Sequence, residues 1–245
     1  MSKVASITKL AGVAGLALAT LTGAAAAEDR EFSWSVTGTG TSDYIFRGLS
    51  LNNEDPALQA SIDGSYGIFY AGVWGSMLDN GSSYGNTELD FYAGIKPELG
   101  PVTFDFGVVY YAYFWGNPGD TNYTELKAGL SYSPVDKLTL KPVFWYVPDQ
   151  DNAPEQYTIE GTAAYELPQV GIFTPTVSGL LGYTEATDVA DFYTTTDGYT
   201  YWNAGISLAV EKFVFDFRYW DTDLDEAAGF YSDERFVFTA SITLP

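Results

Sequence analysis

The sequence contains neither cysteine nor histidine among its 245 residues. Without cysteine, the chain cannot form a disulfide, a thiolate metal site or a cysteine nucleophile. Without histidine, it lacks the commonest general base and metal ligand, and a Ser-His-Asp triad is excluded. Neighbouring carboxylates such as Glu88 and Asp90 are expected on any polar strand face. We therefore predict a protein that is not an enzyme and holds no cofactor or metal.

Basic residues are also scarce, with 11 Lys and Arg against 32 Asp and Glu. This balance repels nucleic acid and anionic membrane surfaces, so we expect no nucleic-acid partner. The acidic stretch 221–226 suggests calcium, but an EF-hand loop needs glycine at its sixth position and a carboxylate at its twelfth. Glu226 and Ser232 occupy these positions. A solvated acidic loop is the simpler interpretation.

Long apolar runs are absent after the N-terminus. Lys3 and Lys9 precede an apolar stretch that ends in Ala25-x-Ala27, which predicts a secretory signal peptide over 1–27, cleaved before Glu28. A retained N-terminal membrane helix is the alternative. Removal of two lysines from 11 basic residues leaves nine against 32 acidic residues, a formal charge of −23 for the domain 28–245. Beyond residue 27 no run reaches the roughly 18 residues of a spanning helix, so only a closed barrel could cross a membrane.

Alternating side chains run through the whole of the remaining sequence. In FSWSVTGTGT (32–41), Phe32, Trp34 and Val36 alternate with serine and threonine. Because side chains on a strand point to opposite faces in turn, this segment has an apolar and a hydroxyl-rich face. The same pattern predicts twelve strands, at about 32–46, 57–66, 68–78, 88–96, 102–115, 123–132, 137–146, 156–165, 172–183, 201–209, 213–221 and 234–244.

The connections between these strands alternate strictly between long and short. Six long, acidic connections follow the odd-numbered strands, and five short ones follow the even-numbered strands. Outer-membrane barrels have this plan, with short periplasmic turns and longer extracellular loops. Aromatic residues, 17% of the chain, gather near strand ends, where the membrane interface favours them. We predict an all-β fold: a single antiparallel up-and-down transmembrane β-barrel of about twelve strands, with the apolar faces toward lipid.

The polar faces would then line the lumen, where charge tunes selectivity. Alternatively, these groups pair with one another and plug the barrel, since twelve strands lie between filled small barrels and open wide ones. Arg47, beside the first long connection, is expected to form an ion pair with Glu54 or Asp55; the alternative is that it marks the pore mouth. The candidate pore-lining residues are Asp63, Asp90, Asp105, Glu125, Lys127, Lys141, Glu160, Asp216, Arg218 and Arg235, and the same face carries Glu88, Lys96 and Glu234.

Several motifs resemble a known family. SDYIFRGLSLNNEDPALQASIDGSY (42–66), FYAGVWGS (69–76), ELDFYAGI (88–95), VVYYAY (108–113), NYTELKAGLSYSP (122–134) and DTDLDEA (221–227) are similar to the TorF-type porin family, also called Gcw-chp. The resemblance implies an outer-membrane β-barrel with a channel role and no established catalytic residues. One departure is the C-terminus, Leu244-Pro245, because many such barrels end in an aromatic residue that the insertion machinery reads.

Three functional hypotheses follow. The first is an outer-membrane porin, a passive diffusion channel for small solutes with a mild preference for cationic or neutral ones. The second is a closed structural or adhesive barrel whose acidic loops bind a partner or divalent cations. The third is a soluble periplasmic β protein that binds a ligand through its aromatic residues. The partners of the first are membrane lipid and small solutes, and the sequence leaves the oligomeric state open.

Overall fold

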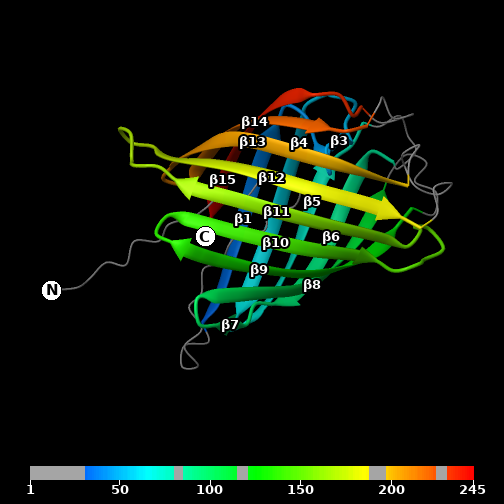
Figure 1. Cartoon of the computed structure of the whole chain (residues 1–245), viewed down its shortest axis with the longest axis horizontal. Coiled ribbons are helices and arrows are strands. Elements are labelled where there is room, and N and C mark those ends of the chain that lie inside the picture. The colour runs from blue at the N-terminus through cyan, green and yellow to red at the C-terminus, as the bar shows by residue number, and fades with distance from the viewer. Residues whose placement is uncertain (1–30, 80–84, 115–120, 188–196, 225–230) are drawn as a thin grey trace.

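The computed structural model describes residues 31–79, 85–114, 121–187, 197–224 and 231–245 (Figure 1). The predicted signal peptide lies outside these ranges. Within them, no helix is long and apolar enough to cross a membrane. Every regular element described is a β-strand.

Twelve strands form one closed barrel. Each pairs antiparallel with its neighbours along the chain, and the pairs β1–β15 and β6–β8 complete the ring. The predicted all-β, up-and-down barrel is confirmed. The barrel strands are β1 (Phe32–Thr41), β4 (Ala57–Tyr66), β5 (Phe69–Met77), β6 (Thr87–Ile95), β8 (Val102–Phe114), β9 (Tyr123–Val135), β10 (Leu138–Val147), β11 (Gln156–Glu166), β12 (Thr174–Ala186), β13 (Gly198–Val210), β14 (Phe213–Thr222) and β15 (Arg235–Leu244).

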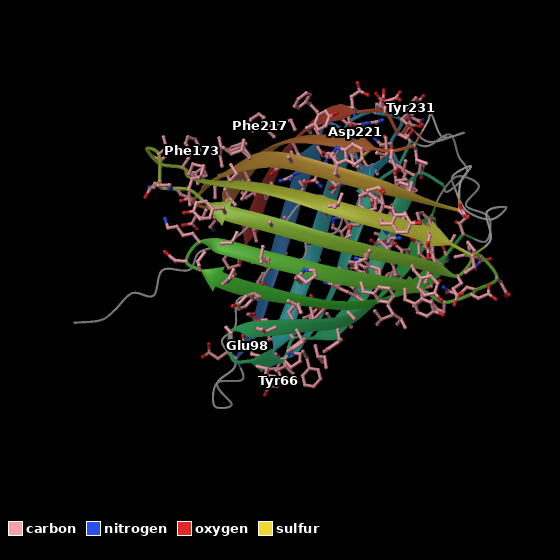
Figure 2. The ribbon with its side chains drawn as sticks, in the orientation of Figure 1. Tyr66, Glu98, Phe173, Phe217, Asp221 and Tyr231 are labelled. Carbon is pink, nitrogen blue, oxygen red and sulfur yellow. The ribbon has the colours of Figure 1, made fainter. Side chains whose placement is uncertain are left out.

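The alternation in the sequence decides which face each side chain takes. Phe32 and Trp34 are exposed on the outside of β1, whereas Ser35 and Thr37 are buried inside. The outward side chain of Phe217 on β14 can be followed in Figure 2. The barrel thus has an apolar outer surface and a polar inner one, as the alternation predicts.

Hydroxyl groups line the inner face around β1. They form cross-strand pairs at 2.8–3.1 Å, which add to the backbone ladder at the point where the barrel closes. The pairs are Ser33 with Ser65, Thr37 with Thr243, and Thr41 with Thr239.

The connections separate by length at the two ends of the barrel. Short turns, such as 136–137 and 211–212, lie at the end that also holds the C-terminus (Figure 1), which we call the inner end. Lys137 and Glu211 have positive φ angles of 67° and 52°, as tight hairpin turns require. The long connections meet at the opposite, outer end. A two-residue strand, β7 (Glu98–Leu99), pairs with the start of β8 and lengthens one of the turns at the inner end.

The first strand is shorter than predicted. The sequence pattern continues to residue 46, but β1 ends at Thr41. Its hydroxyl donates to the carbonyl of Asp43 at 2.7 Å, and Ser42 closes the ladder by exchanging hydrogen bonds with Phe238. The apolar residues that follow are therefore buried inside the barrel and do not face lipid. Pattern alone does not distinguish these two apolar environments.

Candidate functional site: the lumen and its inserted loop

The segment 42–56, here called the inserted loop, folds into the outer half of the lumen. It contains a small hairpin of β2 (Ile45–Phe46) and β3 (Leu49–Ser50). Arg47 and Gly48 form its tip, with φ angles of 51° and 85°. Two consecutive positive φ angles identify a type I′ turn, the connection that suits a two-residue hairpin. The tip is buried: Arg47 is 6% exposed, and Gly48 lies against Tyr201 of β13 and Thr222 of β14.

Gly48 allows this close approach. A β-carbon at this position would lie 2.5 Å from Thr222 Cγ2 and 2.8 Å from Tyr201 Cβ. Both distances are well below van der Waals contact, and the positive φ disfavours any side chain. Thr222 and Tyr201 belong to barrel strands, so they cannot move away without distorting the wall. Only glycine lets the hairpin dock here.

We expect Gly48→Ala to displace the hairpin while leaving the barrel ladder intact. The displaced Arg47 would become accessible to trypsin, so cleavage after Arg47 should accelerate at least tenfold, because cleavage follows the population of the open loop. Gly171→Ala is the matched control, since Gly171 has a similar φ of 61° but no atom within 4 Å of the place that a β-carbon would take. Equal trypsin sensitivity in both variants would contradict the docked position of the tip.

Asp43 anchors the base of the inserted loop. Its carboxylate accepts hydrogen bonds from Ser50 at 2.6 Å and from Arg235 at 3.1 Å. Arg235 also pairs with Glu54 at 3.3 Å. Burial raises the pKa of the Asp43 carboxyl, while the bonds from Ser50 and Arg235 act in the opposite direction. Asp43 and Arg235 thus tie the loop to β15 at the outer rim.

The tip is held by an ion pair across the lumen. Arg47 contacts Glu125 of β9, and the Tyr111 hydroxyl donates to the same carboxylate at 2.9 Å. On the other side, Tyr199 donates to the carbonyl of Arg47 at 3.0 Å. The structure thus pairs Arg47 with Glu125, where the sequence suggested Glu54 or Asp55, and Glu54 pairs with Arg235.

Two apolar clusters pack on either side of the inserted loop. The first joins Tyr44 to Trp74, Tyr92 and Tyr111, and the second joins Ile45 and Leu49 to wall residues that include Tyr201. The rings of Tyr44 and Trp74 lie 5.4 Å apart. These contacts bury large aromatic surfaces, the main contribution to holding the loop inside. The inserted loop, not lipid, therefore covers much of the aromatic surface in the outer half.

All ten candidate pore-lining residues occupy inward positions, but in two different environments. In the outer half, Asp90 and Glu125 are 0% and 1% exposed beneath the inserted loop. In the inner half, the side chains of Asp105 and Asp216 keep 18% and 21% exposure. The inner half therefore admits water, and the outer half is packed. Glu234, also expected inside, is exposed before β15 begins, so that prediction is wrong.

Most of the inner charges are held by neighbouring side chains. Arg218 donates to Asp216 at 2.9 and 3.0 Å and to Asn203 at 2.7 Å. Glu160 accepts from Trp145 at 2.9 Å and from Tyr201 at 2.8 Å. Such bonds fix the lining side chains in place. Their role in conduction stays a prediction.

Asp63, an inward carboxylate on β4, is also held by hydrogen bonds from neighbouring side chains. Asp63 accepts hydrogen bonds from Ser61, at 2.8 Å, and from Tyr92. Lys127 donates to Asp105 at 2.7 Å. Among the described residues, no group of three or more carboxylates is placed to hold a metal ion.

Sequence reasoning missed the inserted loop itself. The available signal was local: SDYIFRGLSLNNEDP combines short polar residues, the Arg-Gly turn and a second turn at Asn53 and Glu54, with φ angles of 52° and 64°. Such density of turn residues is unusual for a strand followed by a solvated loop. It indicates a compact folded segment, although not where that segment packs.

Comparison with solved structures supports the fold. The KdgM porin superposes with a TM-score of 0.58 at 9% identity, covering 86% of this chain and 98% of that one. A KdgM porin in complex with disordered oligogalacturonate gives 0.60 at 9% identity, covering 86% and 99%. The NanC porin gives 0.57 at 11% identity, covering 87% and 100%. At these identities the likeness concerns the fold alone: this chain has the β-barrel architecture of porins.

Comparison of sequences adds the family. No curated protein matches the sequence significantly. The profile of a family described as bacterial protein of unknown function, Gcw_chp, matches residues 23–244. This range covers almost the whole chain, including the inserted loop and all twelve barrel strands. The chain belongs to the Gcw_chp family.

Proposed function

We propose that this protein is an outer-membrane porin, as the TorF-type resemblance implies, and that it is a passive diffusion channel for small solutes without enzymatic activity. The observation that carries the proposal is the closed ring of strands with an apolar outside and a polar, water-accessible inner half. A barrel with this distribution is stable in lipid, because its backbone groups are paired within the ring. We further propose that residues 1–27 are the signal peptide that directs its export.

The inserted loop is the proposed constriction of this channel. Its hairpin packs into the outer half, where Arg47 and Glu125 meet, so the path that remains for solutes at this level is narrow. The conductance should therefore be smaller than that of an unobstructed barrel of the same size. The acidic outer connections, for example Asp149, Asp151 and Glu155, underlie the proposed mild preference for cationic or neutral solutes at the entrance.

Planar-bilayer recording and liposome swelling test the proposal. We expect discrete current steps from purified protein and swelling in small neutral sugars, with rates that fall as solute size increases. Absence of both, in the native chain and in a variant without the hairpin, would overturn the channel and favour a closed structural barrel. A processed chain that stays monomeric in buffer without detergent would overturn the membrane location.

A further inference from the structure

Basic residues are concentrated inside the barrel, although the chain as a whole is acidic. The structure describes eight of them, and two, Lys137 and Lys212, lie in inner turns. The remaining six are inside: Arg47, Lys96, Lys127, Lys141, Arg218 and Arg235. Arg47, Arg218 and Arg235 each pair with a carboxylate that no lysine shares, whereas Lys96 and Lys127 share Asp105, so the three lysines are the group whose charge needs an explanation.

These lysines share one side of the inner half. Lys96 follows β6 directly, and Lys127 and Lys141 lie on β9 and β10, which are neighbours in the ring. Lys127 Nζ lies 2.7 Å from Asp105 Oδ2, and Lys96 Nζ lies 4.0 Å from the same oxygen. Lys141 lies on the same face of β10 as Trp145, which is the register partner of Lys127 on β9. We call Lys96, Lys127 and Lys141 the lysine group.

The negative charge nearby does not balance this group. Asp105 is shared between two lysines and also accepts a hydrogen bond from Tyr70 at 2.7 Å. Asp63 also attracts Lys96 but is bonded to Tyr92 and Ser61. Three ammonium groups thus face two carboxylates. In a partly buried lumen, where screening is weaker than in bulk water, the surplus positive charge favours an anion from solution.

Aromatic rings keep the lysine group in position. Lys96 Nζ lies 4.7 Å from the centre of the Tyr70 ring, and Lys127 Nζ lies 5.3 Å from the centre of the Trp145 ring. Cation–π contacts of this kind hold these two ammonium groups in place. The side chain of Lys96 is 22% exposed and that of Lys127 is 8% exposed, so water reaches Lys96 more readily.

The opposite wall offers hydroxyl groups. In the ring of twelve, β1 lies six strands from β10, so its serine and threonine side chains line the opposite part of the lumen. We propose that the lysine group binds a small organic anion that carries both carboxylate and hydroxyl groups. Its carboxylate binds the lysines, and its hydroxyls reach these serine and threonine side chains. This inference rests on the proposed function only in requiring that solutes enter the inner half.

Lysine acetylation, followed residue by residue by mass spectrometry, tests the site in detergent-solubilised protein. Glucuronate and glucose serve as the probes, at equal ionic strength, because they differ mainly in the carboxylate. We expect saturating glucuronate to slow acetylation of Lys141 about fivefold, and glucose to leave it unchanged. Lys212, outside the lumen, should react at the same rate throughout. Equal rates for Lys141 in both sugars, or equal protection of Lys212, would overturn the proposal.

A pair of variants identifies the lysine responsible. Lys141→Gln should abolish most of the glucuronate protection of Lys127, whereas the matched Lys212→Gln should preserve it. Full protection of Lys127 in Lys141→Gln would contradict the role of Lys141. Heat-modifiable mobility on gels checks that both variants fold. The assay needs no conductance, so protection in a barrel that passes no current would support the anion site and separately refute the channel.

Discussion

Removing the β2–β3 hairpin is expected to raise the single-channel conductance several-fold. The backbone N–H of Leu51 donates to the carbonyl of Tyr44 at 2.8 Å, so these residues are already adjacent. Two glycines can therefore connect Tyr44 to Leu51 in place of residues 45–50, with loss of the hydrogen bond from Ser50 to Asp43. The change removes the side chains of Ile45, Arg47 and Leu49 from the outer half of the lumen.

The expected increase follows from the packing of that region. With the hairpin present, Glu125 and Asp90 are sealed from solvent, whereas the inner half already admits water. Without the hairpin, the barrel wall alone sets the width of the lumen in its outer half. We expect roughly a three- to tenfold larger current step. The barrel should persist because its strand ladder does not include the hairpin.

A control tests for a general effect of altering an outer connection. Replacing Asn152 and Ala153 with two glycines changes another outer connection, 148–155, and keeps its acidic residues. Its conductance should equal that of the native chain. An unchanged current in the hairpin variant would show that the inserted loop is not the constriction.

Arginine at Ile62 is expected to destabilise the barrel by about 2–4 kcal/mol, the cost of a cationic side chain on the lipid face at the bilayer midplane. Ile62 is 61% exposed on the outside of β4. Its register partners are Val36 on β1 and Val73 on β5, each near the middle of its strand. The position is therefore at the centre of the apolar band, too far from either interface for arginine to reach water easily. Urea unfolding of protein refolded in liposomes measures the effect.

Thr39→Arg is the control on the opposite face of the sheet. Thr39 lies on β1, three residues from Val36, and its side chain points into the lumen. The free energy of unfolding should change by less than about 1 kcal/mol, because arginine can stay hydrated there. Equal destabilisation by the two variants would show that the assignment of faces is wrong. The comparison thus tests the membrane-facing surface independently of any transport assay.

The two-residue period of the sequence was sufficient to predict the barrel. Apolar and polar side chains alternate along nearly every strand, and a shift of one residue would reverse both faces. Lipid outside and water inside make that register strongly preferred. The alternating lengths of the connections predicted the up-and-down order of the strands. The predicted strand boundaries agree with the structure within a few residues, except at the end of β1. There, Tyr44 and Phe46 continue the alternation into a segment that leaves the barrel wall.

The sequence by itself determined which residues share the polar face of each strand, because the alternation depends only on neighbours along the chain. The tertiary structure decided which inner charges meet. Arg47 and Glu125 are 78 residues apart, and Lys96, Lys127 and Lys141 come from separate segments of the chain. Their proximity depends on the order and stagger of strands around the ring and on a loop that folds inward. The alternation along each strand contains no information on the order and stagger of the strands or on the inward fold of the loop. The proposed constriction and the lysine group can therefore be recognised only in the closed barrel.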